Sequence, residues 1–174
     1  MNSAIEILFN RRSIREYKEA QISNEELELV LKAGTCAPTA MNYQSPIIVA
    51  VQNKEDIAYM SKLNAAIMKS EGFDPFYGAP TVLVVLADAN NKNAVKDGSL
   101  VMGNLMNAAY ALGLGSCWIN RASELFDMPE GKQLLKKWGI EGEYVGIGNC
   151  ILGYPDQDHP QMKPRKENYV YYVR

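Results

Sequence analysis

The stretch Thr81–Ala87 reads TVLVVLA and decides the fold. Seven consecutive uncharged residues, most of them β-branched or leucine, predict a strand that is buried on both faces and therefore lies inside a sheet. Working outward, three more segments predict strands: Pro46–Val51, Ser116–Ile119 and Tyr144–Leu152. Near the C-terminus only Tyr169–Val173 regains strand character. The sequence thus predicts a sheet of about five strands.

Helical patterns occupy the segments between these strands. Ser3 with Glu6, and Ser23 with Glu26, have the spacing of a capping box and predict two helices before the first strand. Apolar residues at helical intervals predict further helices over Asp56–Met68, Ala94–Leu112 and about Ser123–Trp138. The helix over 94–112 is apolar on more than one face, as in helices that pack against a second subunit. No repeat or linker interrupts the chain, so we expect one layered α/β or α+β domain over residues 1–174.

The composition is that of a folded globular protein. Of the 174 residues, 47% are hydrophobic and 22% charged, and the formal net charge is −2. These values exclude the disordered, collagen-like and disulfide-scaffold classes. The slight negative charge argues against a surface built for nucleic acid or an anionic membrane. No apolar run reaches the roughly 18 residues of a membrane span, so we expect a cytoplasmic protein without a membrane partner.

Cysteine and histidine offer little material for catalysis. Cys36, Cys117 and Cys150 are far apart and form no C-x-x-C pair, so neither a disulfide framework nor a cysteine-ligated zinc site is indicated. His159 is the single histidine and lies in a polar, proline-containing stretch that predicts a surface loop. A site that needs two imidazoles is therefore excluded, and we expect no metal.

Basic residues gather in two short windows at opposite ends of the chain. The windows contain seven of the 18 basic residues: Arg11, Arg12, Arg15 and Lys18, then Lys163, Arg165 and Lys166. Guanidinium groups match phosphate oxygens in pairs, so an anion held between the windows is one interpretation. Two separate, solvated basic patches are the other, and the sequence does not show whether the windows meet.

Two loops carry residues suited to a flat, polar ligand. Gly113–Ser116 is no dinucleotide fingerprint, because Trp118 stands where a third glycine is needed, and the chain contains no P-loop. Gly115 nevertheless permits close approach of a flat ligand to the backbone. The loop Ala37–Pro46 contains amide side chains that suit the edge of a heterocycle, although turn formation explains them equally well.

Together these segments carry a resemblance. The order RRSIREY (11–17), APTAMNYQSP (37–46), GLGSCWI (113–119) and KPRKE (163–167) resembles the FMN-dependent nitroreductase family over nearly the whole chain. The resemblance implies an α+β fold, a three-layer α/β/α sandwich around a mixed, mostly antiparallel sheet. It also implies an obligate homodimer with FMN at the subunit interface, the long helix in that interface and a C-terminal arm exchanged onto the partner's sheet.

The resemblance further implies a set of cofactor-binding residues. Arg11, Arg12, Ser13 and Arg15 would contact the ribityl phosphate and the pyrimidine side of the flavin, and Lys163 with Arg165 would complete the phosphate grip. Pro38, Thr39 and Asn42 would come from the other subunit, Gly115 and Ser116 would present backbone N–H groups near the reactive flavin nitrogen, and Asn64 would contact a flavin edge. Family members often have Trp after the Gln-Ser/Pro step, where this chain has Ile47.

The implied activity is an FMN-dependent oxidoreductase that needs no catalytic side chain, because the cofactor carries the chemistry. NADH or NADPH would reduce FMN and leave, and a nitroaromatic, quinone or similar acceptor would follow in a ping-pong cycle. Positive groups near the pyrimidine edge would favour negative charge on the reduced ring. Phe73, Phe76, Tyr77 and Trp118 would line the acceptor pocket or serve as core.

Alternatives remain open at this point. One is a specialised relative, such as a reductive dehalogenase-type or flavin-fragmenting enzyme, for which the segment between Ile57 and Pro80 leaves little room for a lid. Another is a non-catalytic FMN-binding or storage protein. A third is a structural or protein-binding domain with two solvated basic patches.

Overall fold

The strand expected at the centre of the sheet is central in the structure. The computed structural model describes residues 3–174, and in it the sheet order is β1-β2-β4-β3 with every ladder antiparallel. Seven of the eight residues of β2 (Thr81–Asp88) are buried, as the uncharged run predicts. The other strands are β1 (Pro46–Val51), β3 (Gly115–Ile119) and β4 (Tyr144–Gly153). β1 and β3 are therefore the two edges.

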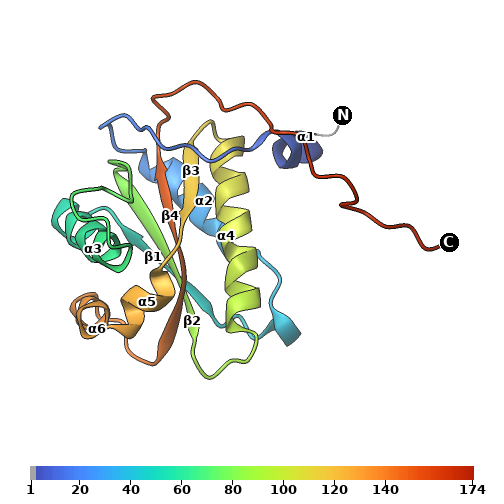
Figure 1. Ribbon diagram of the computed structural model, residues 1–174. Helices are drawn as coiled ribbons and strands as arrows, with labels where there is room; N and C mark the ends of the chain where they lie inside the picture. The colour runs from blue at the N-terminus through green and yellow to red at the C-terminus, as the bar shows by residue number, and fades with distance from the viewer. Residues whose placement is uncertain (1–2) are drawn as a thin grey trace.

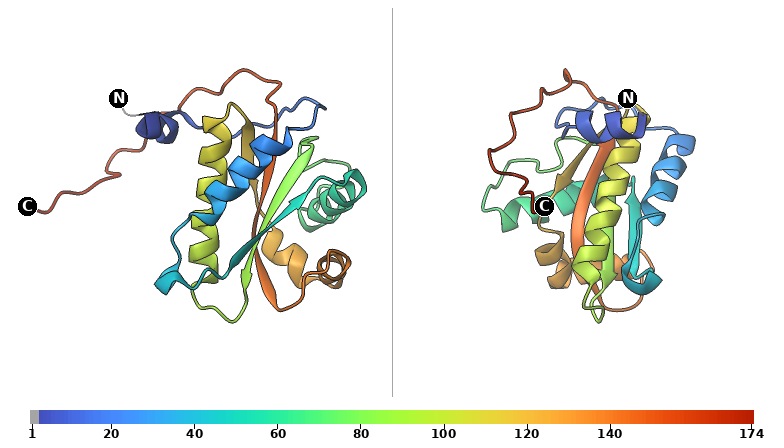
Figure 2. Two further views of the ribbon diagram at one scale, coloured as in Figure 1. Left: turned by 180° about the vertical axis from the view of Figure 1, so that it is seen from behind. Right: turned by 90° about the vertical axis from the view of Figure 1, so that its right-hand side faces the viewer.

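Helices cover both faces of the sheet and make the expected three layers (Figure 1). The helices are α1 (Ser3–Asn10), α2 (Asn24–Thr35), α3 (Lys54–Ile67), α4 (Ala94–Ala111), α5 (Ala122–Asp127) and α6 (Pro129–Lys137), with a short 3₁₀ turn η1 (Ala40–Asn42) before β1. α2 and α4 pack together on one face (Figure 2), and α3, α5 and α6 cover the other. The α+β fold with an α/β/α sandwich is confirmed.

Local sequence explains where these helices begin and end. The capping box before α2 is present, because Ser23 Oγ accepts from the backbone N–H of Glu26 while the Glu26 carboxylate accepts from that of Ser23. The single helix expected over 123–138 is instead two helices. Met128 between them has an extended backbone (φ −71°, ψ 153°), because a residue before proline avoids the helical region and Pro129 then opens α6.

The sheet has four strands within the chain instead of about five. Tyr169–Val173 forms no strand, and each of its side chains is more than 60% exposed on a C-terminal tail that leaves the body of the protein (Figure 2). The sheet is also less mixed than expected, since its parallel pairing is limited to one isolated bridge between Ser13 and Ser116. The strand pattern at the C-terminus thus lacks a partner strand among the described residues.

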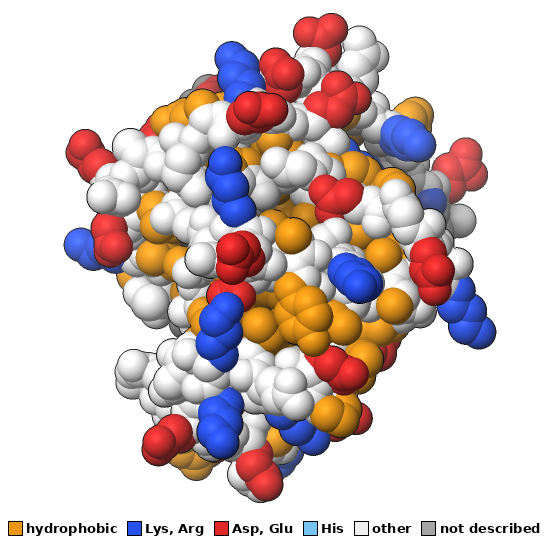
Figure 3. Space-filling model, turned by 90° about the vertical axis from the view of Figure 1, so that its left-hand side faces the viewer, with side chains coloured by type: hydrophobic (Ala, Val, Ile, Leu, Met, Phe, Trp, Pro, Cys, Tyr) orange, Lys and Arg blue, Asp and Glu red, His pale blue; other side chains and the backbone are white. Residues whose placement is uncertain are grey.

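The side of the molecule formed by α3 and α6 carries charges of both signs. Figure 3 shows Lys/Arg and Asp/Glu side chains interspersed there over apolar atoms, without a broad patch of one sign. Within residues 3–174, no helix is long and apolar enough to span a bilayer.

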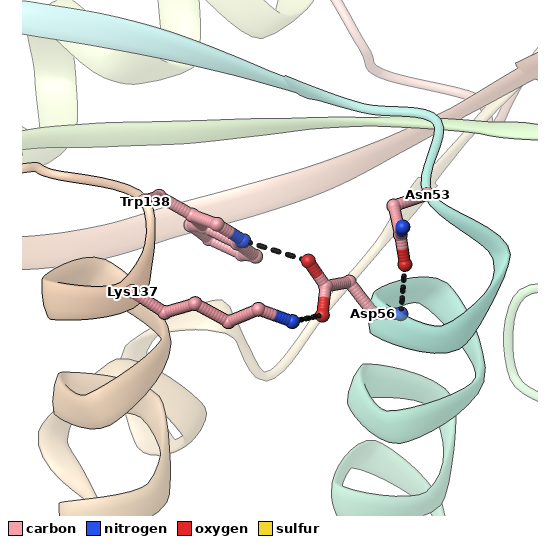
Figure 4. Close-up of polar contacts among 4 residues, drawn as sticks. All are labelled: Asn53, Asp56, Lys137 and Trp138. Atoms are coloured by element: carbon pink, nitrogen blue, oxygen red, sulfur yellow. Dashed lines mark hydrogen bonds and ion pairs between the residues drawn. The ribbon is translucent and has the colours of Figure 1, made fainter.

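One buried carboxylate joins α3 to α6 on this side. Asp56 is 6% exposed, and its two carboxylate oxygens accept hydrogen bonds from Lys137 Nζ and from Trp138 Nε1, the latter at 2.9 Å (Figure 4). The side chain of Asn53 caps α3 by accepting from the backbone N–H of Asp56. The bonds from Lys137 and Trp138 hold the pKa of Asp56 below its ordinary value. Asp56 therefore stays ionised and ties the two helices together.

Asp56→Asn is expected to lower the free energy of unfolding at pH 7 by roughly 1.5–3 kcal/mol, the usual contribution of a hydrogen bond to a charged group. Because the folded-state pKa of Asp56 is depressed, its contribution is complete above the ordinary value of 3.8 and is lost as pH falls through the folded value. Urea titrations of both proteins between pH 7 and pH 2 measure this. The difference in unfolding free energy between wild type and Asp56→Asn should shrink in acid. A difference that stays constant with pH contradicts the stabilising role of the ionised Asp56 carboxylate. Glu55→Gln, at an exposed neighbour, is the matched control.

Candidate functional site

The basic segment after α1 lies along one end of the sheet. We call residues 11–18 the N-terminal strap. Ile14 N–H donates to the carbonyl of Ser116 in β3 (3.0 Å), and Lys18 N–H donates to the carbonyl of Tyr154, just after β4 (3.0 Å). The strap thus crosses the sheet end where β3 begins and β4 finishes (Figure 1).

Further bonds fix the strap from both sides. Gln157 Oε1 accepts from the backbone N–H of Arg15 at 2.7 Å, and Asp156 N–H donates to the carbonyl of Glu16 at 2.9 Å. The Tyr17 hydroxyl donates to the carbonyl of Ile14 at 2.7 Å, and burial raises the pKa of that phenol. Tyr17 is therefore neutral and structural, and the strap is a rigid base for the side chains that it presents.

The three strap arginines have different surroundings. Arg12 Nη1 donates to the carbonyls of Phe9 (2.8 Å) and Arg11 (2.6 Å), so it serves the open carbonyls at the end of α1. Arg11 is half-buried and Arg15 is exposed, and no carboxylate among residues 3–174 forms an ion pair with either guanidinium. Arg11 and Arg15 can therefore offer their donors to an anion, together with the half-buried Ser13, whereas Arg12 already has partners.

Gly115 and Ser116 lie directly beside the strap, as expected for two parts of one site. The glycine, however, is needed for packing within the chain. An added Cβ at Gly115 would come within 2.8 Å of Ile14 Cγ2, so the strap itself occupies the space that the sequence suggested for a flat ligand. Ser116 is 2% exposed. Contact of these two residues with a flavin stays a prediction.

The loop with Pro38, Thr39 and Asn42 lies at the opposite end of α4 (Figure 1). It is held there by Asp97 in the first turn of α4, whose Oδ1 accepts from the backbone N–H of Ala40 at 3.0 Å. Thr39 Oγ1 accepts from the backbone N–H of Gln44 and closes the turn. Pro38 and Asn42 are exposed. Because α4 has 18 residues, the loop and the strap are separated by about 27 Å of helix.

Three other predicted site residues are not brought to the strap. Asn64 in α3 is fully buried, and its Nδ2 donates to the carbonyl of Asn120 at 3.0 Å. Lys163 and Arg165 are exposed on the tail and form no ion pair among the described residues. Within residues 3–174 the bond between the tail and the strap comes from Gln157, at the start of the tail, and not from these two basic residues.

The aromatic residues proposed for an acceptor pocket divide into two groups. Phe76 is a core residue, fully buried beneath α3, whereas Trp118 is partly buried and packs against the core on the opposite face with Gly148 and Met102. Phe73 is 44% exposed and packs edge-on against Tyr77, with ring centroids 5.5 Å apart. The Tyr77 ring lies 6.0 Å from the Arg15 guanidinium. Phe73 and Tyr77 thus border the strap.

Cysteine and histidine side chains do not supply a nucleophile near the strap. Cys117 and Cys150 are buried free thiols, and burial raises the pKa of Cys150 to about 12, which keeps it protonated. His159 is exposed on the tail, and its ring lies 5.5 Å from that of Tyr110. The arrangement of the strap suits binding of an anion.

The fold and this strap agree with one known family. The model of the Nitroreductase family matches residues 8–154 of the chain. The chain belongs to this family. Among its nitroreductase relatives, an Archaeoglobus fulgidus protein with the provisional name NADH dehydrogenase/NAD(P)H nitroreductase is 31% identical over 163 residues, which cover 91% of this chain and 88% of the relative. The FMN reductase [NAD(P)H] of Bacillus subtilis is 26% identical, over 95% of this chain and 70% of that protein.

A solved nitroreductase confirms the fold. The crystal structure of the Bacteroides fragilis nitroreductase with bound FMN superimposes with a TM-score of 0.91 at 28% identity and covers all of both chains. The family match ends at residue 154, so the tail lies outside it. The resemblance to the nitroreductase family is thereby confirmed, and three of the four sequence segments lie inside the family match.

Sequence reasoning missed the residues that hold the site in place. Asp97, Gln157 and Asp74 each bind a backbone N–H of a segment proposed for ligand contact or bordering it. Asp97 carries a detectable signal, since it is a charged residue on the buried side of an apolar helix and is only 3% exposed. Gln157 and Asp74 lie in polar loops, where no such contrast exists.

Proposed function

We propose that this chain binds FMN and acts as an NAD(P)H-dependent oxidoreductase on flat, electron-poor acceptors such as nitroaromatics or quinones. The observation that carries the proposal is the strap, where Arg11 and Arg15 have no carboxylate partner among the described residues. Guanidinium and hydroxyl donors suit a phosphate dianion, so the residues present fit FMN. The name of the Bacillus subtilis relative, an FMN reductase, and the FMN in the Bacteroides fragilis structure support the same cofactor.

Three residues of the strap and two of the tail take defined roles in this proposal. Arg11 and Ser13 hold the phosphate, with Lys163 and Arg165 closing over it from the tail. Lys163 is six positions after Gln157, a span of at most about 22 Å, so the tail stays within reach of the strap. Arg15 faces the pyrimidine side and favours negative charge there. FMN, when bound, supplies the hydride chemistry. The chain binds and orients FMN and leaves room for the acceptor to reach it.

A homodimer completes the site. The strap and the loop at 38–42 lie at opposite ends of α4, so one chain cannot place both against one flavin. A two-fold axis across α4 brings the loop of one subunit to the strap of the other and generates two equivalent sites. Apolar side chains exposed near this helix, such as Leu8, Phe9 and Leu100, would become covered. We therefore propose that Pro38, Thr39 and Asn42 act across the interface.

The phosphate role has a direct test in flavin affinity. Arg11→Ala and Arg165→Ala are each expected to weaken FMN binding about tenfold to a hundredfold, because each removes a charge-assisted bond of roughly 1.5–3 kcal/mol. Fluorescence titration of FMN with the apoprotein gives the dissociation constants. Lys18→Ala removes a strap charge without an assigned contact and is the control. Unchanged affinity in both arginine variants refutes the phosphate grip.

The activity itself is tested by an anaerobic visible spectrum after FMN loading and desalting. Bleaching of the flavin band by NADH or NADPH, and its return with a quinone or nitroaromatic, is the expected result and identifies the donor. A band that neither nucleotide bleaches indicates a storage protein instead. Only 13 residues (68–80) join α3 to β2, which leaves no room for a long lid and favours an open acceptor site over a specialised, lid-closed one.

A further inference from the structure

The turn at Asp74–Gly78 is organised by a single carboxylate. Asp74 Oδ1 accepts from Ser61 Oγ of α3 at 2.6 Å and from the backbone N–H of Phe76 at 2.9 Å. Its Oδ2 accepts from the backbone N–H of Gly78 at 2.6 Å. Both carboxylate oxygens are thus used, and the turn is tied to α3 at one point and to itself at two.

This anchoring maintains an unfavourable backbone at Tyr77. Its φ of 53° is in the left-handed region, which residues other than glycine and asparagine rarely adopt, so the surrounding hydrogen bonds must hold the backbone there. Phe76, fully buried on one side, and Ala79, 3% exposed on the other, keep the turn seated on the core. The Tyr77 ring is therefore presented toward the strap by a rigid support.

The ring that is presented in this way meets Arg15. The Arg15 guanidinium lies 6.0 Å from the centroid of the Tyr77 ring, within the range of a cation–π interaction. The backbone of Arg15 is fixed as well, because its N–H donates a hydrogen bond to Gln157 Oε1. Arg15 is thus held at its backbone by an amide and at its head by an aromatic ring, without a carboxylate partner among the described residues.

An aromatic partner has a consequence that a carboxylate would not have. A carboxylate orients an arginine but cancels its charge for any third group, whereas a neutral ring attracts the cation through its quadrupole and leaves the net charge in place. We propose that Tyr77, supported by Asp74, is a positioning residue that holds the Arg15 guanidinium toward the reduced flavin. The inference rests on the proposed FMN site at the strap and adds two residues to it.

The test compares Tyr77→Leu with Tyr77→Phe in FMN-loaded protein. The measurement is the ratio of the dissociation constants for oxidised and reduced FMN, obtained from the midpoint potentials of bound and free flavin. Tyr77→Leu is expected to shift this ratio about two- to fivefold against reduced FMN, the equivalent of one exposed cation–π contact. Tyr77→Phe keeps the ring and should stay close to wild type. The shift should vanish when Arg15→Gln is already present, because both variants act through one guanidinium.

Asp74→Asn provides a second, independent variant. It keeps the Tyr77 ring but weakens the turn that supports it. We expect the ratio of the dissociation constants for oxidised and reduced FMN to shift in the same direction, so this variant tests the inference even if Tyr77→Leu does not fold. Equal loss of affinity for both flavin states in both variants would show a structural role only and overturn the inference. Wild-type protein that retains no FMN refutes the proposed function instead, so the two failures are distinguishable.

Discussion

A chain that ends at residue 166 is expected to fold, to run as a monomer and to lose its flavin on desalting. Residues Tyr169–Val173 lie on the exposed tail and contact no part of the sheet, so their removal takes nothing from the core of one chain. Lys163 and Arg165 remain, so the proposed phosphate contacts are not deleted directly. The truncation therefore isolates the arm.

The expected loss of the proposed homodimer follows from two features that have no partner among the described residues. β1 pairs with β2 along one side only, which leaves an open edge, and Tyr169–Val173 has the pattern of a strand without a neighbour. Pairing of this segment with the partner's β1 would satisfy both. Loss of three tyrosines and two valines should raise the dimer dissociation constant at least about a hundredfold.

Sedimentation velocity at several concentrations, with the flavin absorbance followed in the same runs, measures both effects. A variant with residues 167–174 replaced by eight Gly and Ser residues separates side chains from length, and we expect it to behave like the truncation. A truncated protein that stays dimeric with unchanged affinity contradicts the arm exchange.

Gly146→Ala is expected to destabilise the fold by about 3 kcal/mol or more, at the high end for overpacking. Gly146 lies in β4 where the strand passes beneath the start of α5, and an added Cβ would fall 2.1 Å from the carbonyl oxygen of Ala122. That oxygen belongs to the backbone of a buried residue, so no side-chain rotation relieves the overlap. Either β4 or α5 therefore has to move to accommodate the added methyl group.

Gly98→Ala is the matched comparison. There the added Cβ would meet Ile147 Cγ1 at 2.5 Å, a side-chain atom and not a backbone atom, and alanine is favoured over glycine inside α4. We expect a clearly smaller loss in guanidinium unfolding experiments. Equal stability of Gly146→Ala and wild type would mean that β4 and α5 are less closely packed than the structure shows.

Patterns within one element were enough to predict most of the fold. The uncharged run in β2 and the capping box before α2 are local signals, and both elements lie where they were expected. The expected fifth strand does not form within residues 3–174, because the pattern at Tyr169–Val173 reports strand propensity, whereas a strand needs a partner, and the described residues offer none. The helix break at Met128 was not predicted from the sequence, although Pro129 is a known signal for one, because the helical spacing of apolar residues continues across the break.

The candidate site was predictable in its charges but less so in its connections. The strap was found from its arginines, yet sequence could not separate Arg12, which serves the carbonyls of α1, from Arg11, which has no carboxylate partner among the described residues. The residues that position the loops act across long separations, such as Asp97 on Ala40 and Gln157 on Arg15. Bonds of this kind depend on how the sheet brings distant segments together.

The same long separation sets the order in which the protein can be assembled during synthesis. Residues 11–18 leave the ribosome before Ser116, Tyr154 and Gln157, three of their hydrogen-bond partners, and Gln157 is 142 positions after Arg15. Contacts of high sequence separation are slow to form, because the entropy of loop closure is lost before the contact is gained. The strap therefore lacks these partners until Gln157 has emerged, and no translation product that stops before the segment after β4 can hold the strap in place.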